Sequence, residues 1–167
     1  MKMLNRWRDR IDGIIEPVAR KMNVEANKVS YASLIFAFIA GILFYFSYEH
    51  HIFLVFASIA TLANGFLDAI DGKIARLRKK ASMKGDFIDH AIDRFSDAFI
   101  IGGIAASPWC GKFVAISAMA AVLIVSYMGT QAQAVGYKRL YSGILGRADR
   151  LAILIFSPFI QYFTGKI

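Results

Sequence analysis

The sequence is poor in residues that cross-link a chain or interrupt helices. It has one cysteine, Cys110, and three prolines among 167 residues. A single cysteine excludes a disulfide framework and a thiolate metal site within one chain. Few prolines leave long helices uninterrupted. Acidic residues are also scarce, with 12 Asp and Glu against 20 Lys and Arg, while 57% of the residues are hydrophobic. Such a composition is too apolar for an ordinary soluble domain and favours a membrane protein.

The apolar residues fall in long blocks that predict five membrane-spanning helices. These blocks cover residues 29–48, 52–67, 91–107, 113–135 and 151–164. A helix needs about 20 mostly apolar residues to cross a bilayer core. The second block reaches that length only if it continues into residues 68–76, and the third only if it begins near Asp86. We therefore predict an all-α integral membrane protein in which a charged segment joins two spans and enters both.

The first 26 residues predict an amphipathic segment before the membrane domain of residues 27–167. Apolar residues recur there at helical spacing, with Arg and Asp between them: Leu4, Trp7, Ile11, Ile14, Ile15 and Val18. A helix of this kind is expected to lie in the membrane interface. The alternative is a short helix that packs on its own protein.

Basic residues concentrate in the connections on one side of the predicted membrane domain. The other side carries only Lys112 and Lys166. Because cytoplasmic loops hold the excess of Lys and Arg, we expect the amino terminus and the charged segment to face the cytoplasm, in the cell membrane. The net charge of +8 then belongs to one face, which suits a lipid bilayer and phosphorylated substrates. No basic soluble module is present to bind nucleic acid.

The charged segment, residues 66–99, contains half of the acidic residues of the chain. They are Asp68, Asp71, Asp86, Asp89, Asp93 and Asp97. Residues three or four apart share one face of a helix, so Asp68 and Asp71 form one acidic face and the last three residues form another. The two helices are antiparallel neighbours. We therefore expect their acidic faces to meet at the edge of the bilayer.

An acidic cluster at this depth needs a positive partner. One Asp at the centre of a membrane helix costs about 2.5–3.5 kcal/mol. Neighbouring Arg and Lys residues are one candidate partner, and divalent metal is the other. All-oxygen ligands favour Mg²⁺ or Mn²⁺. Salt bridges that merely cap two helices are an alternative, but they give no reason for the small residues Gly72, Ala75 and Gly85 on the same surface.

The spacing of these residues resembles the full signature of the CDP-alcohol phosphotransferases, which are membrane enzymes of phospholipid headgroup synthesis. The matching pattern is Asp68-x2-Asp71-Gly72-x2-Ala75-Arg76-x8-Gly85-x3-Asp89-x3-Asp93. The resemblance implies that a CDP-linked lipid donates its phosphatidyl-type group to an alcohol and that CMP leaves.

The resemblance also implies roles for individual residues. Asp68, Asp71 and Asp89 would hold metal, with Asp93 at the second of two ions and as the general base. The CDP-lipid would be bound by Gly72, Ala75, Arg76, Ser82, Gly85 and Asn27. For Asn27, at the start of the first span, a helix cap is the alternative.

Two other stretches resemble the branch that makes phosphatidylinositol phosphate and archaetidylinositol phosphate. One is Asp93-Arg94-x2-Asp97, and the other is the GRADRL piece of residues 146–151. This likeness implies inositol 1-phosphate as the acceptor and a phosphatidyl- or archaetidyl-type donor. The acceptor phosphate would be bound by Arg147 and Arg150, which are three residues apart, with help from Lys138 and Gln131. Positive-inside charge is the alternative explanation for the basic residues.

The chain departs from its relatives in two ways. Where inositol phosphate enzymes often have SYxKARAE, residues 126–133 replace the lysine, arginine and glutamate with Gly129, Gln131 and Gln133. This change leaves glycerol 3-phosphate, or a free alcohol such as serine, open as the acceptor. The family usually has six membrane helices, whereas five are visible here.

The resemblance further implies a homodimer, for which Gly102 and Gly103 supply a small packing face, although packing within one chain explains them equally. A cation-binding transporter is the alternative from another functional class.

Overall fold

Five long helices follow one another in the computed structural model, which describes residues 13, 15–78, 82–137 and 147–165. They are α2 (Ala26–Phe46), α3 (Ile52–Leu77), α4 (Met83–Ala106), α5 (Lys112–Ala134) and α6 (Arg147–Thr164). No strand occurs among these residues. The predicted all-α class is confirmed, and each predicted span corresponds to one of the five helices.

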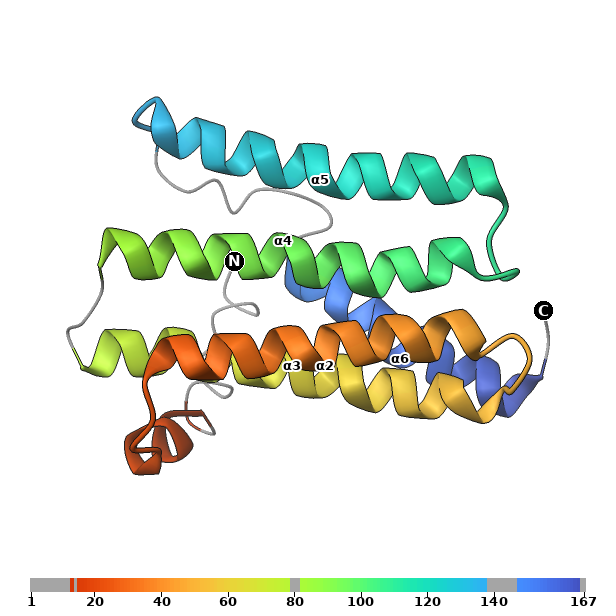
Figure 1. Ribbon diagram of the computed structural model, residues 1–167, viewed down its shortest axis with the longest axis horizontal. Helices are drawn as coiled ribbons and strands as arrows, with labels where there is room; N and C mark the ends of the chain where they lie inside the picture. Colours follow the sequence, from red (N-terminus) through yellow and green to blue (C-terminus); the bar gives the residue numbers. More distant parts are fainter. Residues whose placement is uncertain (1–12, 14, 79–81, 138–146, 166–167) are drawn as a thin grey trace.

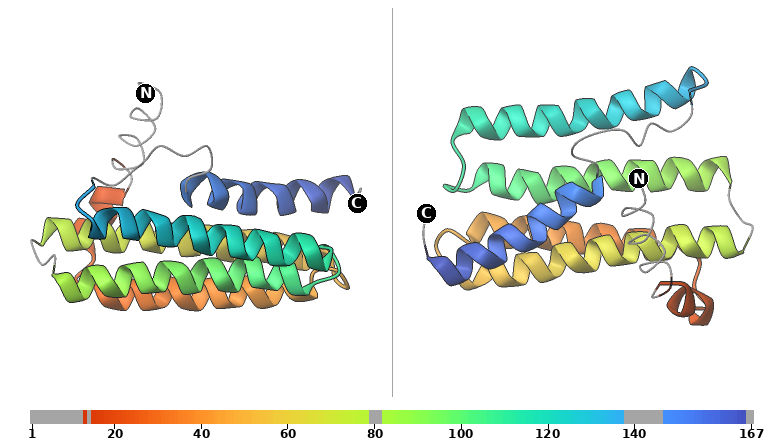
Figure 2. Two further views of the ribbon diagram at one scale, coloured as in Figure 1. Left: turned by 90° about the horizontal axis from the view of Figure 1, so that it is seen from above. Right: turned by 180° about the vertical axis from the view of Figure 1, so that it is seen from behind.

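Helices α2 to α5 run up and down in turn, and α6 crosses over α3 (Figures 1 and 2). Helix α2 packs against both α3 and α4, whereas α5 packs against α4 and α6 packs against α3. The connections of residues 47–51 and 107–111 lie together at one end of the bundle (Figure 1). The charged ends of α3 and α4 lie at the opposite end. The acidic halves of these two helices therefore belong to one face of the molecule.

The charged segment is helical where it continues the second and third predicted spans, as the sequence predicted. Helix α3 does not stop at the end of its apolar block but runs through Asp68 and Asp71 to Leu77. Helix α4 begins at Met83, and its preceding residue Ser82 caps it by accepting a hydrogen bond of 3.0 Å from the amide of Gly85. Both acidic stretches are therefore rigid helix rather than loop.

Three helices are long and apolar enough to cross a membrane, namely α2, α3 and α5. Helix α4 carries Lys84 and Asp86 in its first turn, and helix α6 carries Arg147 and Arg150 in its first turn. Less of the length of these two helices is therefore apolar. The bundle also exposes many large hydrophobic side chains, including Ile35 and Phe56 at 60% and 51%. An exposed apolar surface of this extent is what a lipid environment requires. The chain is a multi-pass membrane protein.

Small residues allow α2 and α4 to approach closely. A Cβ atom added to Gly103 would meet the backbone carbonyl of Gly41, and one added to Gly41 would meet the carbonyl of Phe99. Ala37 and Ala40 are fully buried nearby. Packing within one chain therefore accounts for Gly103.

The segment before α2 packs on the protein itself. Residues 15–21 are helical, and Ile15 and Ala19 are buried against Ile70 and Ile74 of α3. Val18 is 36% exposed. Within its described residues, one side of the predicted amphipathic segment thus covers α3, close to the signature residues. Leu4, Trp7, Ile11 and Ile14 lie outside the described residues.

Polar contacts hold this segment against α3. The Glu16 carboxylate lies 2.7 Å from Arg20 Nη2 and 3.0 Å from Lys73 Nζ. Hydrogen bonds from Arg20 and then from Lys73 lower the pKa of Glu16. Arg78 also donates a 2.7 Å hydrogen bond to the carbonyl of Met22. The amino-terminal segment is therefore tied to the helix that carries Asp68 and Asp71.

We expect Gly103→Ala to destabilise the protein, because the added methyl group meets the Gly41 backbone, which cannot move aside as a side chain can. An overpacked contact of this kind costs about 1–3 kcal/mol of unfolding free energy. The control is Gly129→Ala, where an added Cβ has no atom within 4 Å. Thermal unfolding in detergent compares the two variants, and equal melting temperatures would contradict the close contact between α2 and α4.

Candidate active site

Carboxylates of α3 and α4 meet at the charged end of the bundle. Asp68, Asp71 and Asp89 each offer an oxygen, and these three atoms lie within 4.8 Å of one another. Asp71 is 3% exposed and Asp93, one turn after Asp89, is 5% exposed. The structure thus brings the acidic faces of both helices together, as their spacing predicted.

This cluster has the donor set of a divalent metal site. Among the described residues, no ion pair involves Asp71 or Asp89, and the Oδ2 atom of Asp71 is buried without a hydrogen-bond partner. A buried carboxylate oxygen without a donor is costly unless a cation approaches it. Carboxylate oxygens are the ligands that hard divalent cations prefer. The residues present therefore fit such an ion.

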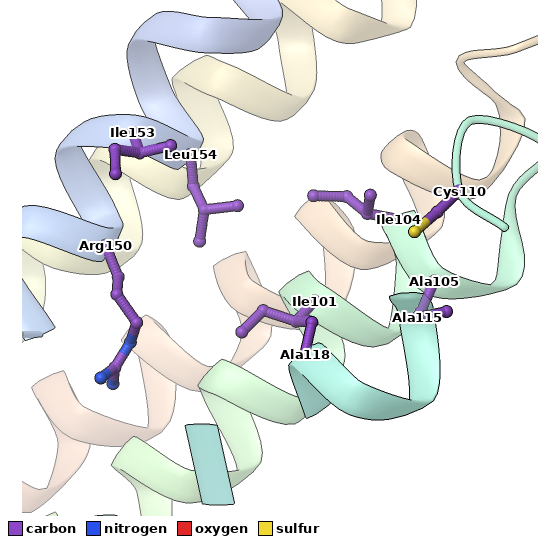
Figure 3. Close-up of a pocket in the computed structure, with 9 residues that line it drawn as sticks. All are labelled: Ile101, Ile104, Ala105, Cys110, Ala115, Ala118, Arg150, Ile153 and Leu154. Carbon is purple, nitrogen blue, oxygen red and sulfur yellow. The ribbon is translucent and has the colours of Figure 1, made fainter. Parts of the chain in front are cut away.

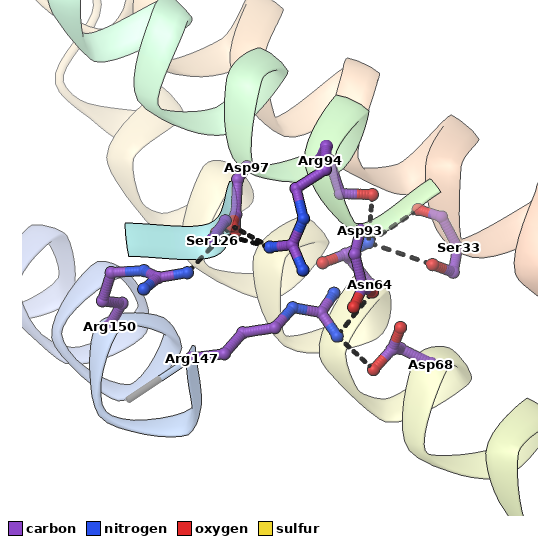
Figure 4. A network of polar contacts seen from close by, with 10 residues as sticks. Ser33, Asn64, Asp68, Asp93, Arg94, Asp97, Ser126, Arg147 and Arg150 are labelled. Atoms are coloured by element: carbon purple, nitrogen blue, oxygen red, sulfur yellow. Dashed lines mark hydrogen bonds and ion pairs between the residues drawn. The ribbon is translucent and has the colours of Figure 1, made fainter. Parts of the chain in front are cut away.

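Arg147, at the first residue of α6, enters the same cluster. Its Nη1 atom lies 2.6 Å from Asp68 Oδ2 and 2.7 Å from Asp93 Oδ1, so that it bridges the two acidic helices (Figure 4). Its Nε and Nη2 atoms are buried and have no hydrogen-bond partner among the described residues. The residue proposed from sequence as a phosphate ligand thus balances two carboxylates with one nitrogen and keeps its other donors unused.

Arg150 lies one turn further along α6 and pairs with a different carboxylate. Its Nη2 atom is 2.9 Å from Asp97 Oδ2, and its Nε atom is buried with no acceptor in the described part of the chain. The two arginines predicted to act together therefore lie side by side on α6. Together they present three buried nitrogen donors that have no acceptor among the described residues.

The residues predicted to bind the CDP-lipid lie around the same end of the bundle. A Cβ atom added to Gly85 would lie 3.2 Å from Ser82 Oγ and 4.0 Å from Asn27 Oδ1, so these three residues converge. Helix α2 begins at Ala26 after the N-cap residue Glu25. The helix-cap alternative for Asn27 is therefore wrong.

On α3, a Cβ atom added to Gly72 would lie 4.0 Å from Arg76 Nη2. The exposed Arg76 thus lies beside Gly72, with Ala75 on the turn between them.

Of the two remaining predicted acceptor residues, one lies outside the described part of the chain and the other does not hydrogen-bond to the arginines. Lys138 lies outside the described residues. Gln131 is exposed on the last turn of α5, and among the described residues no hydrogen bond joins its side chain to Arg147 or Arg150.

Sequence reasoning missed a polar contact between three helices next to the carboxylates. Asn64, one turn before Asp68 on α3, donates to the Ser33 carbonyl at 3.0 Å and to the Ser33 hydroxyl at 3.1 Å. It also donates to the Ser96 hydroxyl at 3.4 Å. All three residues are at most 1% exposed. The sequence signal for this contact was Asn64 itself, an amide on the same helical face as Asp68 within an apolar segment. Polar side chains within a membrane are costly unless they are partnered, so Asn64 required a partner.

An apolar cavity of about 250 Å³ adjoins the site between α4, α5 and α6. Arg150 lies at one end and Cys110 near the other (Figure 3). The remaining walls are aliphatic, with Ile101, Ile104 and Leu154 among them. Apart from Arg150, the cavity therefore suits hydrocarbon rather than a polar headgroup.

Comparison with known proteins identifies the family. The model of the CDP-alcohol phosphatidyltransferases matches residues 22–165. The archaetidylinositol phosphate synthase of Methanothermobacter thermautotrophicus is 31% identical over 160 residues, covering 96% of this chain and 79% of that protein. The archaetidylinositol phosphate synthase of Pyrococcus horikoshii is 29% identical over 155 residues, covering 91% and 80%.

A solved structure has the same fold. The crystal structure of Mycobacterium tuberculosis phosphatidylinositol phosphate synthase with CDP-DAG bound has a TM-score of 0.74 to this chain at 22% identity, covering 90% of this chain and 77% of that one. The family model and the first relative agree with the signature that spans α3 and α4. The chain belongs to the CDP-alcohol phosphatidyltransferase family and is a membrane transferase of the CDP-alcohol phosphotransferase type.

Proposed function

We propose that this protein transfers a phosphatidyl- or archaetidyl-type group from a CDP-linked lipid to inositol 1-phosphate and releases CMP. The observation that carries the proposal is the pair Arg147 and Arg150, whose three buried nitrogen donors without a described acceptor lie beside the carboxylate cluster. Guanidinium donors of this kind match the geometry of a phosphate. The names of the two archaeal relatives support the same acceptor.

The family is generally dependent on divalent metal, and the carboxylate cluster fits it. We propose that Asp68, Asp71 and Asp89 hold Mg²⁺ or Mn²⁺, and that Asp93 contributes to a second ion. When bound, the ions supply charge neutralisation on the diphosphate of the donor. The cluster lies at the charged end of the bundle. The lipid chains of the donor would therefore stay in the bilayer, while its diphosphate would lie beside the cations that the carboxylates hold.

The side chains around the cluster divide the remaining work. Asn27, Ser82 and Gly85 on one side, with Gly72, Ala75 and Arg76 on the other, bind the CDP-lipid. Asp93 takes the proton from the acceptor hydroxyl. That oxygen then forms the new bond to the lipid-bearing phosphorus, and the bond from this phosphorus to the CMP oxygen breaks. Arg147 and Arg150 hold the acceptor through its own phosphate.

The arginines recognise a phosphate rather than a particular polyol. Glycerol 3-phosphate carries the same group and is therefore the second candidate acceptor, whereas free serine and free inositol lack the phosphate. We further propose that the protein lies in the cell membrane with its amino terminus and site facing the cytoplasm, and that it forms a homodimer. The excess of Lys and Arg at the site end of the bundle supports this orientation.

We expect purified protein in detergent, given a CDP-linked lipid and Mg²⁺, to release CMP with inositol 1-phosphate. Glycerol 3-phosphate, free inositol and serine are offered in parallel, and product formation is read by CMP release and lipid mass. Release with glycerol 3-phosphate, free serine or free inositol, but not with inositol 1-phosphate, would overturn the proposed acceptor. The matched control is Asp93→Asn, which should abolish transfer while nucleotide binding persists, because the proton acceptor is lost and the residues proposed to bind the CDP-lipid are unchanged.

We expect Asp71→Asn to weaken Mn²⁺ binding by about tenfold or more. Even the loss of a residue that only hydrogen-bonds to a metal ligand lowers metal affinity by about 10- to 100-fold. Titration calorimetry or the Mn²⁺ electron paramagnetic resonance signal measures this without turnover. The control is Asp86→Asn, whose carboxylate is 75% exposed and faces His90 at 3.7 Å. If both variants bind Mn²⁺ equally well, Asp71 is not a ligand.

We expect Arg147→Ala to raise the KM for the phosphorylated acceptor far more than the KM for the CDP-lipid. Hydrogen bonds to charged groups contribute about 1.5–3 kcal/mol, which corresponds to about 10- to 100-fold. Arg147→Lys keeps the charge but loses the forked donors, so its KM should lie between. Arg20→Ala, which removes an exposed arginine paired with Glu16, serves as the control. Equal increases in both KM values would argue against contact with the acceptor phosphate.

A further inference from the structure

Asp97 is a buried carboxylate that the signature does not contain. It lies on α4, one turn after Asp93 and on the same face, and is 5% exposed. It is not among the three residues whose oxygens form the metal-type cluster. A carboxylate at this depth is costly without a positive partner, so its partners should indicate its role.

Two arginines from two helices surround Asp97. Arg150 Nη2 of α6 lies 2.9 Å from Asp97 Oδ2, and Arg94 Nη1 of α4 lies 3.8 Å from the same oxygen. The Arg94 guanidinium also donates a 2.5 Å hydrogen bond to the Ser126 hydroxyl of α5. Figure 4 shows the Arg150 and Arg94 guanidinium groups converging on Asp97 and Ser126. Asp97 thereby joins α4 to α6, and its neighbour Arg94 joins α4 to α5.

The pairing fixes how Arg150 presents its remaining donors. Asp97 occupies Nη2 of Arg150, whereas Nε is buried and has no acceptor among the described residues. Arg150 also lines the aliphatic cavity, which offers its guanidinium no other anion. Without Asp97, nothing described on α4 would hold this guanidinium beside Arg147.

We propose that Asp97 is a positioning residue that holds Arg150 for the acceptor phosphate and so sets the preference for a phosphorylated polyol over the free polyol. This inference rests on the proposed function. Asp97 touches neither substrate. Asp97 orients Arg150 directly. It also anchors Arg94, which in turn donates to the Ser126 hydroxyl of α5. A buried ion pair that only stabilises the fold would instead affect both substrates alike.

The test compares Asp97→Asn with wild-type protein in steady-state kinetics. We expect the KM for inositol 1-phosphate to rise about tenfold or more, the cost of losing one charge-assisted contact. The KM for the CDP-lipid and kcat should change by less than about twofold, as for a change remote from the donor site. The preference for inositol 1-phosphate over free inositol should fall by a similar factor. Glu49→Gln, an exposed carboxylate at the opposite end of the bundle, is the control for charge loss.

A double-mutant cycle with Arg150→Gln separates positioning from a structural role. If Asp97 acts through Arg150, adding Asp97→Asn to Arg150→Gln should leave the KM for inositol 1-phosphate unchanged. The double variant also removes both charges of the Asp97–Arg150 pair, so it avoids a buried Arg150 without a partner if Asp97→Asn alone does not fold.

The outcomes distinguish this inference from the proposed function. Additive effects in the cycle, or an unchanged acceptor KM in Asp97→Asn while the wild type uses inositol 1-phosphate, would overturn the inference alone. A wild-type protein that ignores inositol 1-phosphate would overturn the proposed function and the inference with it.

Discussion

The charge balance between α6 and the acidic faces of α3 and α4 is the constraint on which the site depends. Asp93 and Asp97 are buried at 5% exposure, and each receives an arginine from the start of α6. Removing one partner from a buried pair costs about 3–5 kcal/mol, because the other charge is left without compensation. The first turn of α6 therefore cannot move away from α3 and α4 without a large loss of stability, unless other charges take its place.

This constraint explains the unusual course of α6. Helix α6 crosses α3 instead of continuing the antiparallel order of α2 to α5 (Figure 2). Its contact with α3 includes Leu151, whose Cδ1 atom would lie 3.3 Å from a Cβ placed on Gly65. Since Arg147 must reach Asp68 on α3 and Arg150 must reach Asp97 on α4, the start of α6 lies between the two acidic helices. The aliphatic cavity lies on the α4 and α5 side of the same helix.

The sequence predicted what depends on local spacing. Carboxylates three or four residues apart indicated one acidic face per helix, and the short apolar blocks indicated that α3 and α4 would extend through the charged segment, which the structure confirms. Pairings between distant helices were not predictable in the same way. Arg147 and Asp68 are 79 residues apart, and Asn64 and Ser33 are 31 apart. Periodicity places a residue on a face of its own helix, but it does not specify which face of another helix it will meet.

Arg147 balances the charge of two carboxylates and also retains unused donors, and only a side chain with several nitrogen atoms can do both. One nitrogen, Nη1, serves Asp68 and Asp93, while Nε and Nη2 stay buried without acceptors. Lysine would offer a single nitrogen for both purposes, whereas the planar guanidinium separates charge balance from recognition. A phosphorylated acceptor would bring its own negative charge to these donors. Its binding should therefore depend on how strongly Asp68 and Asp93 hold Nη1, which links acceptor affinity to any cation that shares these two carboxylates.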